Sequence, residues 1–187
     1  MTQNLQNLQE FHLAQINIAL MKAPLHDPIM AKFADALSEV NAIADQSFGF
    51  IWRLQTASGN ATDIRAYPDP KMLVNVSVWQ DVESLKAYVY RSLHGEFFAR
   101  RRQWFEKYQG EHFAMWWIAA NHQPTVEEGK TKLEHLALHG DSPEAFTFAK
   151  PYSPPISSSD FSRTRSPESK DDRRIYGSNE RIYFGRN

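Results

Sequence analysis

The segment Leu73–His94 constrains the fold of this chain more strongly than any other part of the sequence. It opens with a strand-like alternation of valines with polar or aromatic residues: Val74, Val76 and Val78 against Asn75, Ser77 and Trp79. A half-exposed strand does not need tryptophan on its polar face, whereas a strand that lines a partly wet cavity does. The alternation therefore predicts a pocket on the side of Trp79.

The composition allows a substantial hydrophobic core and excludes thiol chemistry. The chain has 187 residues, of which 42% are hydrophobic, a formal net charge of -1 and no cysteine. This length suits one domain plus an appendage, and the charge indicates no nucleic-acid partner. Without cysteine there can be no disulfide, thiolate metal site or cysteine nucleophile. No apolar run reaches the ~18–20 residues of a membrane helix, so we expect a cytoplasmic protein without membrane insertion.

Hydrophobic periodicity predicts the element order β-α-β-β-α-β, followed by one further helix. The expected strands are 11–20, 48–55, 73–79 and 113–119, with a short last strand at 145–149; the expected helices are 27–45, 82–105 with a kink at Gly95, and 124–139. This is the ferredoxin-like order of an α+β fold, with helices on one face of an antiparallel sheet. The other face would be apolar and exposed, which monomers avoid. We therefore predict a homodimer in which two sheets pack as a dimeric α+β barrel.

The composition also divides the chain into three regions. Residues 1–10 form a polar N-terminal extension, residues 11–150 form the barrel domain, and residues 151–187 form a tail rich in proline, serine and charged residues. We expect the tail to be disordered. It is either a plain extension or, because 174–177 and 181–185 are similar, a short motif that binds a protein partner or the dimer itself.

Several short segments carry a family resemblance: Ala14–Asn17, Gly49–Leu54, Asn60–Ile64, Leu73–Trp79, Tyr90–His94 and Ala145–Phe148. They resemble an uncharacterised bacterial family that is grouped with the dimeric α+β barrels of the antibiotic-biosynthesis monooxygenase type. The resemblance covers roughly Phe11–Pro151. That superfamily includes cofactor-free quinone-forming monooxygenases, haem-degrading enzymes, haem-binding oxygenases, isomerases and members without a catalytic role. The resemblance therefore implies the fold and leaves the activity open.

The resemblance also implies candidate catalytic residues. Haem-degrading relatives use an asparagine on the first strand, a tryptophan on the third and a histidine on the helix that follows. Asn17, Trp79 and His94 occupy analogous places in this sequence. A neutral His94 has the chemistry of an axial iron ligand or of a general base. In the structural alternative, His94 packs beside Tyr90 or bonds a carbonyl.

The neighbours of Trp79 are further candidates. Asn75 and Ser77 would face the same cavity, where they either hold a substrate oxygen or pair with neighbouring strands and water. Trp52 and Arg53 are consecutive, so they lie on opposite faces of their strand. Arg53 would bind either Asp63 or a substrate carboxylate.

Tyr90 and Arg91 complete the candidates for substrate binding. Three kinds of function fit the candidates together. The first is an oxygenase-type oxidoreductase acting on a small aromatic or polyene substrate, with His94, Trp79, Asn75 and Asn17 as catalytic residues. It requires no cofactor, although haem on His94 is an option; no other metal site is expected. The alternatives are a non-catalytic ligand-binding or dimerisation module, and an isomerase or cyclase of secondary metabolism.

Overall fold

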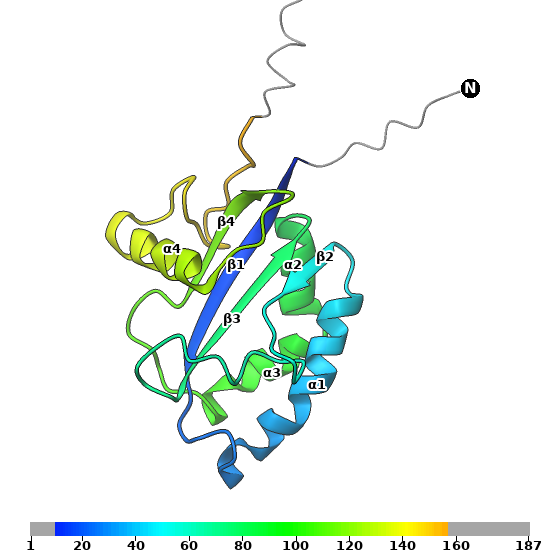
Figure 1. Cartoon of the computed structure of the whole chain (residues 1–187), viewed down its shortest axis with the longest axis vertical. Helices are drawn as coiled ribbons and strands as arrows, with labels where there is room; N and C mark the ends of the chain where they lie inside the picture. The colour runs from blue at the N-terminus through cyan, green and yellow to red at the C-terminus, as the bar shows by residue number, and fades with distance from the viewer. Residues whose placement is uncertain (1–9, 157–187) are drawn as a thin grey trace, which may run out of the picture. The chain divides into compact units, whose positions relative to one another are not determined.

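The computed structural model describes residues 10–156, which contain a four-stranded antiparallel sheet (Figure 1). The strands lie in the order β2-β3-β1-β4, with the bounds β1 Phe11–Leu20, β2 Phe50–Arg53, β3 Met72–Trp79 and β4 Phe113–Ala119. All three neighbouring pairs are antiparallel. Together with the helices between the strands, this is the ferredoxin-like α+β topology, so the predicted fold class is confirmed.

The helices begin where the sequence places capping residues. The 3-10 turn η1 (Pro28–Met30) and α1 (Ala31–Gln46) join β1 to β2, and α2 (Val82–Arg91), α3 (Leu93–Arg100) and the 3-10 turn η2 (Arg101–Gln103) join β3 to β4. The additional helix α4 (Val126–His139) follows β4, as predicted. Asp27, Asp81 and Thr125 each accept a hydrogen bond from a backbone N–H in the first turn.

Two local predictions are wrong. The break after α2 lies at Ser92 and not at Gly95, because Ser92 has extended backbone angles and its Oγ caps α3 by accepting the N–H of His94 at 3.1 Å. Residues 145–149 form no regular strand; Phe146 makes one isolated bridge to Met115 of β4. In both places a capping or bridging contact determines the backbone conformation. Hydrophobic periodicity carries no information about such contacts.

One face of the sheet, the α4 face, is covered by α4 and by the segment between β2 and β3. It consists of the alternate strand residues Ala14, Ile16, Ile18, Val74, Val76, Val78, Ala114, Trp116 and Ile118, each at most 5% exposed. Leu133 and Leu136 of α4 pack on it, with Ile64, Ala66 and Tyr67 from the connecting segment. Our premise for a homodimer, an exposed apolar sheet face, is therefore wrong. The homodimer itself stays a prediction.

Close packing of α4 on this face depends on Gly129. A Cβ atom at this position would lie 2.6 Å from Cδ1 of Ile16 and 3.1 Å from its Cβ. Glycine allows the helix backbone to approach the central strand β1, which no other residue would permit without a shift.

The opposite face, the α1–α3 face, carries Trp79 and is covered by helices of the same chain (Figure 1). Two apolar clusters lie on it. The Trp79 cluster includes Leu13, Ala44, Trp79, Leu85, Met115 and Phe146, and the Trp104 cluster includes Met21, Met30 and Trp104. We predicted a pocket on the side of Trp79, but the indole itself lines none in the described part of the chain, because α1 and α2 of its own chain cover it.

Tyr152, just after the expected boundary at residue 150, makes two hydrogen bonds to earlier parts of the chain. Trp117 Nε1 donates to the backbone oxygen of Tyr152 at 2.8 Å, and the Tyr152 hydroxyl donates to the Asp141 carbonyl at 3.1 Å. The chain divides into two units between Pro155 and Ile156. The predicted disorder of the tail and its two similar motifs fall almost entirely outside the described residues, as do residues 1–9 of the predicted N-terminal extension.

Candidate functional site

Five polar side chains form a band across the α1–α3 face of the sheet. Strand register places Arg53, Ser77 and Gln15 in one row, and Asn75 and Asn17 in the next. Along β1 and the residue after it, this polar band lies between Leu13 of the Trp79 cluster and Met21 of the Trp104 cluster. Polar groups between two apolar clusters on a helix-covered face cost stability unless each finds a partner, so their partners decide what the band does.

The row formed by Arg53, Ser77 and Gln15, here called the inner row, finds its hydrogen-bond partners within the chain. Ser77 Oγ accepts a hydrogen bond from Gln15 Nε2 at 2.8 Å and another from Trp79 Nε1 at 2.8 Å. Gln15 and Ser77 are each 7% exposed, and Trp79 is fully buried. Ser77 is therefore the shared acceptor for two buried donors, which is a structural role.

The row formed by Asn75 and Asn17, here called the outer row, has amide groups with few hydrogen-bond partners. Asn75 is exposed, and its side chain has no hydrogen-bond partner among residues 10–156. Its cross-strand neighbour Asn17 is half-buried and makes one long contact, from Nδ2 to the Ile18 carbonyl at 3.5 Å. Two neighbouring amides on a largely covered face are thus available to a ligand oxygen or N–H group.

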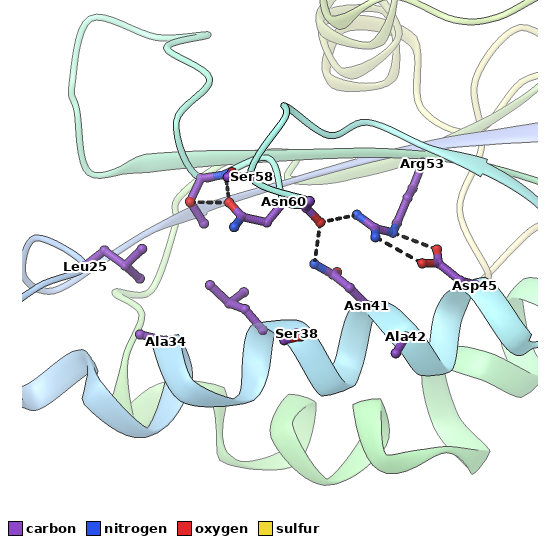
Figure 2. Close-up of a pocket in the computed structure, with 12 residues that line it drawn as sticks. Leu25, Ala34, Ser38, Asn41, Ala42, Asp45, Arg53, Ser58 and Asn60 are labelled. Atoms are coloured by element: carbon purple, nitrogen blue, oxygen red, sulfur yellow. Dashed lines mark hydrogen bonds and ion pairs between the residues drawn. The ribbon is translucent and has the colours of Figure 1, made fainter.

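Arg53 ends the inner row at β2 and is only 9% exposed. Its Nε and Nη2 donate to the two carboxylate oxygens of Asp45 at 2.8 and 3.1 Å, and Nη1 donates to the Gly59 carbonyl at 2.8 Å (Figure 2). The ion pair expected with Asp63 is wrong; Asp63 accepts from the Ser58 hydroxyl instead. The guanidinium fork is occupied by Asp45, so it is not presented to a substrate carboxylate in this state.

A cavity of about 480 Å³ lies between α1 and the loop after β2 (Figure 2). Its lining combines apolar side chains with hydroxyl and amide groups: Leu25, Ala34, Leu37, Ala42, Ser38, Asn41, Ser58, Asn60 and Thr62, with the Arg53–Asp45 pair at one end. Asn41 Nδ2 reaches the Gly59 carbonyl at 3.5 Å, and Asn60 Oδ1 accepts the backbone N–H of Thr62 at 2.9 Å. The lining suits a small polar ligand.

His94 lies on α3 within a stack of aromatic rings. Its ring centroid is 4.8 Å from that of Tyr88, which stacks on Trp79 at 5.0 Å and 26°. Its Nδ1 lies 3.3 Å from the Val89 carbonyl, and because a carbonyl only accepts, Nδ1 carries the proton and Nε2 keeps a lone pair. Burial lowers the pKa of His94, while the bond to Val89 opposes that shift. His94 is therefore a neutral base at pH 7.

The remaining candidates lie apart from the polar band. Trp52 pairs with Val78 and packs on the α4 face, opposite Arg53 as predicted. Tyr90 is 52% exposed at the outer side of α2, where its ring contacts Phe98 and Phe148. Arg91 is exposed at the end of α2. The structure thus brings together Asn17, Arg53, Asn75, Ser77 and Trp79, links His94 to them through Tyr88, and separates Trp52, Tyr90 and Arg91.

Three residues of the site were missed. Gln15 is two residues from both Leu13 and Asn17, so the period of two in a strand places it on the same face as they are, and this could be read from the sequence. Asp45 and Tyr88 offered no such signal, because their roles arise only when α1 and α2 pack on the sheet. Burial raises the pKa of Tyr88, so this hydroxyl stays protonated.

The geometry around His94 does not fit haem. A porphyrin needs a flat apolar slot beside Nε2, and neither the cavity beside α1 nor a smaller one beside Trp52 borders His94. Within residues 10–156, no group of three or more His, Asp or Glu side chains is placed to hold a metal ion. No helix in this part of the chain is both long and apolar enough to span a bilayer.

These features define an α+β protein with a ferredoxin-like sheet and a partly open polar band beneath its helices. The chain belongs to the family described as a domain of unknown function, DUF3291, whose model matches residues 12–162. Its predicted membership of an uncharacterised family is thereby confirmed. No curated protein matches the sequence.

Among solved structures, a protein of unknown function, NE2512 from Nitrosomonas europaea, is 11% identical, covers 63% of this chain and 96% of its own, and has a TM-score of 0.41. PA3566 from Pseudomonas aeruginosa is 13% identical, with coverages of 61% and 98% and a TM-score of 0.40. SnoaB, a cofactor-independent oxygenase from Streptomyces nogalater crystallised as a point mutant, is 14% identical, with coverages of 62% and 96% and a TM-score of 0.34. These similarities are too distant to assign an activity.

Proposed function

We propose that this chain is an oxygenase-type oxidoreductase that binds a small hydroxylated aromatic or polyene substrate against the outer row of the polar band. The observation that carries the proposal is the open amide pair, Asn17 and Asn75, on a sheet face otherwise covered by helices. Apolar clusters on both sides of the band suit an aromatic ring, and the amides suit its oxygen atom.

The proposed chemistry uses groups whose protonation state the contacts support. A phenolic hydroxyl gives its proton to His94 Nε2, which requires the substrate to displace the aromatic rings packed on His94, because neither cavity borders this residue. The amide N–H groups of Asn17 and Asn75 stabilise the resulting oxyanion. The anion transfers an electron to dioxygen, and recombination with loss of water converts the phenol to a quinone. One phenol and one dioxygen give one quinone and one water, so dioxygen is the only co-reactant.

Oxygen uptake with a panel of hydroxylated polycyclic aromatics tests the proposal. Asn75→Ala removes an exposed side chain that stabilises nothing else, so we expect the fold to be kept and turnover to fall by about 10²-fold, the effect of losing one oxyanion donor. Gln55→Ala, at an exposed amide just beyond β2, is the matched control and should keep turnover. Equal turnover of both variants would refute the assignment.

His94 is tested through the pH profile. A base with a lowered pKa keeps its lone pair below pH 6.5, so the rate of the native enzyme should persist into mildly acidic buffer. His94→Gln should lose most of the rate. It should also lose the part of the pH profile in which the rate persists in mildly acidic buffer. A variant with reduced rate and an unchanged profile would show that His94 acts only through packing.

A non-catalytic binding module is the second candidate, and the cavity beside α1 favours it. This cavity of about 480 Å³ contains hydroxyls and amides, and its two charged groups, Arg53 and Asp45, are paired with each other. Asn41→Leu would fill the cavity with an apolar side chain. Loss of ligand binding in Asn41→Leu, with no oxygen uptake by the native protein, would support a binding module. Substrate conversion without oxygen uptake would indicate an isomerase or cyclase.

A further inference from the structure

A second cavity, of about 210 Å³, lies on the other side of the sheet, at the end where β1 begins. Its wall includes Trp52 of β2, Val78 of β3 and His12 of β1, and the turn after β4 adds His122. The eight lining residues include no Lys, Arg, Asp or Glu. A cavity of this size without charged side chains suits a small neutral molecule, and the indole of Trp52 offers it a flat apolar wall.

His122 is held by a carboxylate. Its Nε2 lies 2.7 Å from Oε2 of Glu128, while Oε1 of Glu128 accepts Trp116 Nε1 at 2.8 Å. Burial raises the pKa of Glu128, but the bonds from His122 and Trp116 outweigh it and lower the pKa below its usual value. Since the carboxylate accepts, His122 donates through Nε2–H, and in the neutral tautomer that makes this bond Nδ1 is the hydrogen-bond acceptor.

His12 presents a second acceptor. Its Nδ1 is buried and has no hydrogen-bond partner within the described residues. The ring bonds the backbone of Ala120, which requires Nε2–H as the donor to that carbonyl and leaves the lone pair on Nδ1. An unpaired buried acceptor costs stability, and a ligand that donates a hydrogen bond would remove this cost.

The geometry points to a second ligand site in this cavity, for a small neutral aromatic compound that carries a hydroxyl donor. The ring lies against Trp52, and the hydroxyl donates to Nδ1 of His12 or His122. This site is separate from the polar band, because Trp52 and Val78 belong to the α4 face of the sheet.

Phenol and anisole form the matched pair of probes, because they share the ring and differ in the hydroxyl proton. We would titrate each into the full chain with ¹⁵N-labelled histidines and follow the imidazole nitrogens by NMR. Phenol should shift the ¹⁵N resonance of His12 Nδ1, and anisole should bind at least tenfold more weakly. Equal binding of anisole, or a phenol titration that leaves the histidine nitrogens unchanged, would overturn the proposal.

Variants locate the site. Glu128→Gln replaces an obligate acceptor with an amide whose NH₂ donates to His122 Nε2, so Nδ1 becomes protonated and phenol affinity should fall several-fold. Glu127→Gln, on the same turn and exposed, is the control and should bind phenol normally. His12→Phe should lower phenol affinity at least tenfold, and His122→Gln provides a second test if His12→Phe does not fold. The His12 shift should persist in Asn75→Ala; its loss there would place phenol on the polar band and refute the second site.

Discussion

Ser77→Ala tests how the polar band is held together. The substitution removes the oxygen that accepts Gln15 Nε2 and Trp79 Nε1, each at 2.8 Å, and it adds no bulk. Both donors lie where water has little access, since Gln15 is 7% exposed and Trp79 is fully buried. Leaving a buried donor without a partner costs about 1–3 kcal/mol. Two such donors predict a loss of about 2–6 kcal/mol, a large part of the ~5–15 kcal/mol that stabilises a typical domain.

The assay is equilibrium unfolding in urea, followed by circular dichroism and by tryptophan fluorescence. Ser38→Ala, at an exposed position on α1, is the matched control and should change stability by less than about 0.5 kcal/mol. Gln15→Leu combined with Ser77→Ala should be less destabilised than the sum of the two single variants, because one orphaned donor is then removed. A loss below about 0.5 kcal/mol for Ser77→Ala, at an unchanged m-value, would refute the reasoning.

Three further predictions concern packing, capping and pH. Gly129→Ala should destabilise the domain by about 1–3 kcal/mol in urea unfolding, because its Cβ would meet Ile16, even though alanine favours a helix; a stabilised variant would contradict this. Asp81→Ala should cost about 1 kcal/mol in the same assay by removing the cap at Ser84 N–H. Burial lowers the folded-state pKa of His94 below 6.5, so the unfolded chain binds more protons. Stability should therefore fall as pH drops below 6.5, by up to about 1.4 kcal/mol per pH unit, until the folded pKa is reached. His94→Gln should flatten this dependence, and a profile unchanged by the substitution would assign the dependence to another group.

The predicted homodimer has a direct test. Sedimentation equilibrium of the full chain should give twice the chain mass of 21.6 kDa. The described α4 face is already buried within one chain, so a dimer would have to use another surface. A single-chain mass at all concentrations would contradict the prediction.

The alternation of β1 and β3 could be read from the sequence because side-chain direction in a strand depends only on residue parity. That parity correctly placed Asn17, Asn75, Ser77 and Trp79 on one face and the three valines of β3 on the other. It also separated Trp52 from Arg53. Helix starts at Asp27 and Asp81 were equally accessible, since a cap is a contact between residues two or three positions apart.

What covers each face was decided only by the tertiary structure. The sequence alone determined that Trp79 and Ser77 share a surface. Only the structure shows that α4 covers the face of the β3 valines, while α1 and α2 cover the face of Trp79. The pairing of Arg53 with Asp45 in place of Asp63, and of Ser77 with Gln15, likewise requires elements distant in sequence to meet. The physical reason is that periodicity fixes the direction of a side chain relative to its own backbone, whereas its partner depends on how several elements bury their apolar faces together.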